Sequence, residues 1–106
     1  MLKRVSCLVA VSALLGGPAL ACDYPEGNID DIPRGSTATQ QEMDAARKRV
    51  AAYVKALEEY AACVDARPGG ARDRDRAIEE AQRVADRMNR EIRQFNRSMQ
   101  LRQAST

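Results

Sequence analysis

The chain has 106 residues, of which 17 are lysine or arginine and 15 are aspartate or glutamate, and it contains no histidine. A chain of this length forms at most one domain with a small core, and the lack of histidine excludes mechanisms that need an imidazole base. The near balance of charge gives no overall basicity that would favour nucleic acid as a partner.

Residues 1–21 have the three-part pattern of a secretory signal peptide. Lys3 and Arg4 form a cationic start, an apolar run covers residues 5–15, and the small residues Ala19 and Ala21 precede the site where a signal peptidase would cleave. The apolar run is shorter than the roughly 20 residues that span a bilayer. We therefore expect export to the periplasm or secretion, and the loss of both cations leaves a formally neutral mature chain.

Residues 22–38 are expected to form an extended arm rather than a helix. Pro25, Gly27, Pro33 and Gly35 interrupt any helical pattern, and acidic side chains dominate the segment. We expect the arm to run antiparallel along the first helix and to place three apolar side chains on it: Tyr24, Ile29 and Ile32.

Residues 39–67 are predicted to form the first helix. Thr39 and Glu42 have the spacing of a capping box, in which each side chain bonds the backbone N–H of the other residue. Apolar residues then recur at alternating intervals of three and four, which is typical of a helix that packs along its whole length. They are Met43, Ala46, Val50, Tyr53, Leu57, Tyr60 and Val64.

Residues 68–75 are predicted to form a turn, 76–102 a second helix, and 103–106 a frayed tail. Asp73 or Asp75 is the expected cap of the second helix. The same alternating spacing runs through Ile78, Ala81, Ala85, Met88, Ile92, Phe95 and Met99. The predicted fold is therefore all-α: an antiparallel two-helix hairpin of coiled-coil type with an extended N-terminal arm.

A two-helix hairpin of this size has little core, so we expect a second copy to complete it. Isolated helical pairs that bury one stripe each are marginally stable. A homodimer that forms a four-helix bundle would cover the residues beside the predicted seam: Val54, Ala61 and Val84.

The sequence contains no pattern typical of an enzyme or a cofactor site. It has no glycine-rich phosphate loop, and two cysteines remain after removal of the signal peptide, too few for a zinc site. The adjacent pairs Glu58-Glu59 and Glu79-Glu80 point in different directions on a helix and are expected to face solvent. We expect no catalytic residue, no metal and no cofactor.

Four arginines spaced seven apart form a stripe on the second helix, which the heptad frame places opposite the packed seam. Pairs such as Glu79–Arg83 and Asp86–Arg90 would make this stripe an ordinary solvated surface. Two other interpretations are that the acidic arm docks on part of it, or that it binds an anionic partner. The stripe consists of Arg76, Arg83, Arg90 and Arg97.

Cys22 and Cys63 are expected to form a disulfide. Cys7 leaves with the signal peptide, and the remaining even number of cysteines suits an oxidising compartment. The arm can extend to about 56 Å, which exceeds the roughly 36 Å from Thr39 to Cys63 along a helix. The alternatives are lipidation of Cys22, although Leu20 is one position away from its usual place in a lipidation signal, and two free thiols.

One group of residues resembles a segment of known proteins. The residues are Pro33, Gly35, Ala38, Thr39, Glu42, Met43, Tyr60 and Cys63. Their arrangement resembles that in a group of small exported proteobacterial proteins, which share a Pro-x-Gly…Ala-Thr-x-x-Glu-Met segment and a helix that ends in Tyr-x-x-Cys. The resemblance covers roughly residues 22–63. It implies a shared fold and an exported location, and it implies no activity.

These patterns together favour an exported or periplasmic helical hairpin that acts through protein–protein contacts and not through catalysis. Its partner would be a second copy or an envelope protein, and not nucleic acid. The alternative is an envelope lipoprotein that is anchored through Cys22 and contacts an anionic surface with its arginine stripe. On either hypothesis the chain touches a membrane only if Cys22 is lipidated.

Overall fold

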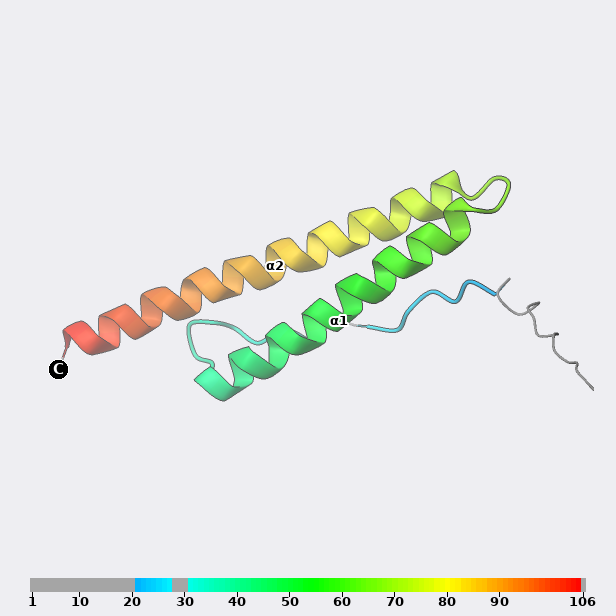
Figure 1. The fold of residues 1–106 in the computed structure, drawn as a ribbon. Coiled ribbons are helices and arrows are strands. Elements are labelled where there is room, and N and C mark those ends of the chain that lie inside the picture. Colours follow the sequence, from blue (N-terminus) through cyan, green and yellow to red (C-terminus); the bar gives the residue numbers. More distant parts are fainter. Residues whose placement is uncertain (1–20, 28–30, 106) are drawn as a thin grey trace, which may run out of the picture.

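The computed structural model describes residues 21–27 and 31–105. Within these ranges the chain forms two helices and no strand: α1 spans Gln40–Asp65 and α2 spans Ala71–Ala104. The helices lie side by side and antiparallel, joined by a short turn (Figure 1). The predicted all-α hairpin is therefore confirmed. The expected signal peptide, apart from its last residue, and Ile29 lie outside the described residues.

Helix α1 begins at the predicted capping box. The N–H of Glu42 donates to the hydroxyl of Thr39 at 3.1 Å, and the N–H of Thr39 donates to the carboxylate of Glu42 at 2.8 Å. Both donors would otherwise lack a partner at the start of the helix. The helix ends at Asp65 rather than at residue 67.

Helix α2 begins earlier than the sequence predicted, at Ala71 rather than at residue 76. Its N-cap is Gly70, which provides no side-chain bond, so the predicted capping by Asp73 or Asp75 is wrong. Asp73 lies in the first turn of α2, where a negative charge stabilises the helix dipole. Residues 72–75, which were predicted to belong to the turn, therefore lie in α2.

The reversal between the helices is tight, and its glycines explain the early start of α2. Gly69 has a φ of 76°, a conformation that side chains disfavour. A Cβ on Gly70 would collide with the backbone carbonyl of Val64, so only glycine lets the chain turn this closely at the end of α1. Helix α2 can therefore begin at the next residue, Ala71. Arg74 then reaches back to Asp65 at 2.7 Å and joins the two helices at the turn.

The buried strip of α2 matches the predicted one at Ala81, Met88 and Phe95, but its other members lie one residue earlier than predicted. Ala77 and Val84 are 0% and 1% exposed, whereas Ile78, the predicted seam residue, is 40% exposed. Ala85 and Ile92 are only partly buried. The strip is displaced toward the side of α2 that the arm covers.

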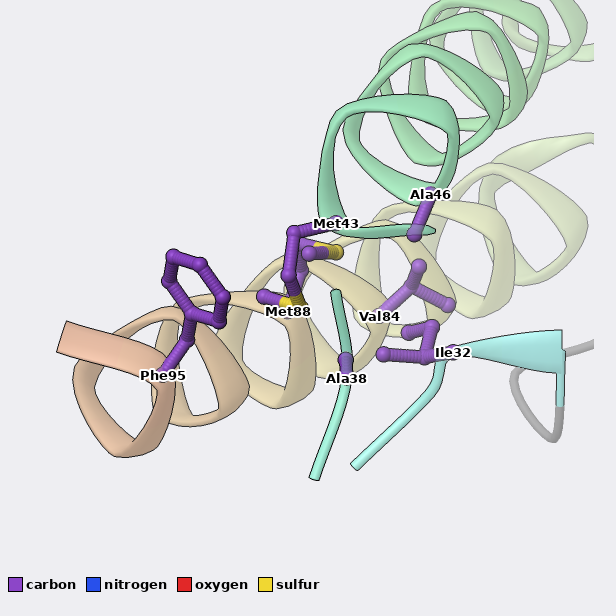
Figure 2. Close-up of a cluster of buried hydrophobic side chains, with 7 residues drawn as sticks. All are labelled: Ile32, Ala38, Met43, Ala46, Val84, Met88 and Phe95. Carbon is purple, nitrogen blue, oxygen red and sulfur yellow. The ribbon is translucent and has the colours of Figure 1, made fainter. Parts of the chain in front are cut away.

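The arm supplies part of the hydrophobic core. Figure 2 shows Ile32 and Ala38, each 4% exposed, beside side chains from both helices. The helical members of this cluster are Met43, Ala46, Val84, Met88 and Phe95. The arm therefore packs against both helices and not against α1 alone.

The arm runs antiparallel to α1, as predicted, before it crosses to α2. Cys22 is bonded to Cys63 near the end of α1, and the guanidinium of Arg49, closer to its start, donates to the backbone carbonyl of Asp31 at 2.9 Å. Further along the arm, the hydroxyl of Ser98 on α2 donates to the carbonyl of Ser36 at 3.1 Å.

Gly35 brings the arm directly against the backbone of α2. Its N–H donates to the carboxylate of Glu91 at 2.8 Å. A Cβ at this position would collide with the backbone carbonyl oxygen of Glu91 and would also crowd the backbone nitrogen of Phe95 at 2.7 Å. Because both obstacles are backbone atoms of a helix, they cannot move aside as a side chain can.

We predict that Gly35→Ala destabilises the fold by about 1–3 kcal/mol, the usual cost of forcing extra atoms into a packed site. Urea unfolding followed by circular dichroism would measure the loss. Ser36→Ala is the matched control, because it changes an exposed side chain next to Gly35 and keeps the carbonyl that Ser98 bonds. Equal stability of both variants would contradict the close approach of the arm to α2.

Candidate interaction surfaces

The two sides of the hairpin differ, because the arm covers only one of them. On the other side an open groove lies between α1 and α2, and no described residue of the arm lines it. Its floor consists of Val50, Ala51, Val54, Ala85 and Met88, and its charged border consists of Arg47, Lys55 and Glu58. We call this surface the open groove.

The open side continues toward the turn as a second hollow. Its apolar lining residues are Ala61, Ala62, Ala81 and the exposed Ile78, and its polar ones are Glu58, Asp65, Arg74 and Gln82. Of the residues expected beside a second hairpin, Val54 lines the open groove and Ala61 lines this hollow. Val84 does not, because it is buried in the cluster that contains Ile32.

A disulfide fixes the start of the arm. Cys22 and Cys63 are bonded, with their Cα atoms 5.8 Å apart, as the sequence predicted. Beside them the ring of Tyr24 packs edge-on against Tyr60, with ring centroids 5.0 Å apart. The sulfur of Cys22, which a lipid anchor would require, is therefore engaged in this bond.

Two glutamates on the arm side of α2 hold polar groups in place. Glu91 is 14% exposed, accepts the N–H of Gly35 and also pairs with Arg87 at 3.3 Å. Glu80 is 17% exposed, pairs with Arg83 and accepts the hydroxyl of Tyr53 at 3.3 Å. Neither glutamate is a solvated surface residue, which corrects the expectation for Glu80.

The surroundings of Glu80 change the acidity of two tyrosines. Burial raises the pKa of Tyr53 to about 12, and the negative charge of Glu80 contributes to the rise. Burial also raises the pKa of Tyr24, again with a contribution from Glu80. Both effects disfavour the charged phenolate.

The arginine stripe is largely unpaired. Arg83 pairs with Glu80 and not with the predicted Glu79. In the described part of the chain Arg76, Arg90 and Arg97 are exposed and form no ion pair, and no acidic side chain of the arm pairs with the stripe. The predicted Asp86–Arg90 pair is therefore absent from the described residues. The arm does lie near part of the stripe, because the charges of Arg76 and Arg83 act to lower the pKa of Tyr24.

The predicted seam does not include Glu91, although the spacing along α2 links this residue to the arm side. Glu91 lies seven residues after Val84 and seven before Ser98, so all three share one side of α2. A polar side chain in a row that becomes partly buried is expected to have a hydrogen-bond partner, which here is the N–H of Gly35. The predicted seam runs through Ala85 and Ile92 instead, each one residue after this row.

Comparison with protein-family models found no match, and comparisons with curated proteins and with solved structures found none either. Over residues 21–27 and 31–105, no three potential metal ligands lie close enough together to hold an ion. Neither described helix is both long and apolar enough to cross a membrane.

We predict that removal of the disulfide lowers the free energy of unfolding by up to about 4 kcal/mol, because the bond closes a loop with a sequence separation of 41. Urea unfolding with and without reductant would measure it. A double Cys22→Ser, Cys63→Ser variant should have the stability of the reduced protein and should not respond to reductant. Equal stability of the oxidised and reduced proteins would show that the bond does not hold the arm.

We predict a loss of stability between pH 10 and about pH 12 that depends on Tyr53. The folded protein keeps the phenolic proton that the unfolded chain releases near pH 10, so this stabilisation is complete below pH 10 and disappears as the pH approaches 12. Urea midpoints across this range would measure it. Tyr53→Phe should show a shallower decline, and parallel curves for both proteins would contradict the assignment.

Proposed function

We propose that this chain is an exported protein that acts through protein–protein contacts along its open groove. The observation that carries the proposal is the difference between the two sides of the hairpin. The arm fills one side with Ile32 and Ala38, whereas the apolar floor of the open groove has no covering segment among the described residues. Apolar surfaces with a polar border are typical of protein interfaces.

Three observations support an exported location. The first 21 residues have the pattern of a signal peptide. The Cys22–Cys63 bond suits an oxidising compartment, where disulfides persist. The resemblance to small exported proteobacterial proteins implies the same location.

The arginine stripe supports a second candidate function, contact with an anionic surface of the envelope. Arg76, Arg90 and Arg97 are exposed and unpaired in the described part of the chain, so their charges are available to a phosphate or carboxylate group. Anchoring through Cys22 would have to compete with its disulfide bond to Cys63. We therefore rank this candidate below the contact through the open groove.

We predict that Ala51→Glu abolishes the contacts of the chain and leaves its fold intact. Ala51 is exposed on the floor of the open groove, so a glutamate there would place a charge in an apolar interface at little cost to the free protein. Chemical cross-linking in the envelope of the exporting cell, followed by purification of the chain, would compare the captured species.

The matched control for this experiment is Ala45→Glu. Ala45 is also exposed on α1, but it lies six residues away and therefore about 120° around the helix. The wild type and Ala45→Glu should form the same cross-linked species, and Ala51→Glu should not. Identical cross-linking by all three proteins would contradict a function through the open groove.

A further inference from the structure

Four residues of α1 form a row beside the open groove with symmetric spacing. Arg47, Ala51, Val54 and Glu58 are separated by four, three and four residues, so they lie on one face of the helix. A cation stands at one end, an anion at the other, and two small apolar residues lie between them. The ends are 11 residues apart, or about 17 Å along the helix.

This row is complementary to itself when it is reversed. In an antiparallel arrangement of two copies, Arg47 of each chain lies opposite Glu58 of the other, and Ala51 lies opposite Val54. A two-fold axis between residues 52 and 53 generates both ion pairs at once, as a closed dimer requires. A parallel arrangement in register would instead bring like charges together.

We infer that the open groove binds a second copy of this chain, with the two α1 helices antiparallel and in contact along this row. The inference rests on the proposed function, because it names the partner that the open groove contacts. The small side chain of Ala51 at the centre permits the close approach of roughly 8–10 Å between helix axes that such packing needs.

Both charges of the row are available for contacts between chains. Among the described residues Arg47 pairs with Asp44 alone, at 3.9 Å, and both side chains are more than half exposed. Glu58 is exposed and has no ion pair within residues 31–105. The arm lies on the other side of the hairpin, so it does not obstruct the second copy.

A charge-reversal experiment tests the register directly. Sedimentation equilibrium of the exported, oxidised chain should show a dimer, and Arg47→Glu or Glu58→Arg alone should raise the dissociation constant at least about tenfold, because each turns two attractive contacts into repulsive ones. The double variant Arg47→Glu, Glu58→Arg should regain most of the affinity. An equimolar mixture of the two single variants should also associate, since each supplies the charge that the other needs.

Two controls separate this register from a general effect of charge. Arg97→Glu and Glu59→Arg make the same charge changes at exposed positions outside the row, and both should dimerise like the wild type. Circular dichroism would verify that every variant stays folded. A dimer that tolerates both single reversals would overturn the inferred register.

A chain that remains monomeric at high micromolar concentration would overturn the inference altogether. The proposed function could still hold in that case, and the cross-linking comparison of Ala51→Glu with Ala45→Glu would decide it separately. A captured envelope protein with no cross-linked dimer would show that the open groove serves a different partner and not a second copy.

Discussion

Two helices that pack side by side bury only the stripes that face each other, and in this chain the arm supplies the apolar surface that the pair lacks. Ile32 and Ala38 enter the core because Gly35, between them, lets the arm lie directly on the backbone of α2. The arm leads directly into α1, because the buried Ala38 is followed at once by Thr39, the N-cap of the helix. The disulfide at Cys22 then holds the other end of the arm. The hairpin and its arm are therefore better described as three packed segments than as two helices with a tail.

The same arrangement explains how charge is distributed over α2. Glu80 and Glu91 are 11 residues apart, about three helical turns, and so both face the arm. Each accepts a hydrogen bond from a neutral group, the hydroxyl of Tyr53 or the N–H of Gly35. Burying a carboxylate costs free energy unless a cation compensates it, and an arginine lies beside each one. Arg83 and Arg87 are used in this way, whereas Arg76, Arg90 and Arg97 of the stripe have no ion pair among the described residues.

The features that followed from the sequence depend on local patterns or on a simple count. The capping box of Thr39 and Glu42 requires four consecutive residues, and the pairing of Cys22 with Cys63 follows from an even number of thiols and a sufficiently long arm. The features that were missed depend on tertiary contacts. The burial of Val84 in place of the predicted Ala85 results from the packing of the arm against one side of α2, which no spacing in α2 itself encodes. The open groove could not be predicted for the same reason, because it is the side that the arm leaves uncovered.

The chemistry of the two sides bears on how a partner could bind. On the arm side a covalent bond and a hydrogen bond to a half-buried carboxylate hold the arm on the helices, and the hollow that remains there is lined by the arm itself together with Tyr53 and Val84. The open groove has a floor of small apolar side chains and a sparse charged border, with no such bonds across it among the described residues. A partner can therefore cover the open groove without displacing any part of the fold. Because the hairpin is complete before such binding, little ordering entropy opposes association, and the affinity is determined mainly by the fit of the opposing surface. A reversed copy of α1 meets that requirement with its own residues, since the row from Arg47 to Glu58 has the same spacing in both directions.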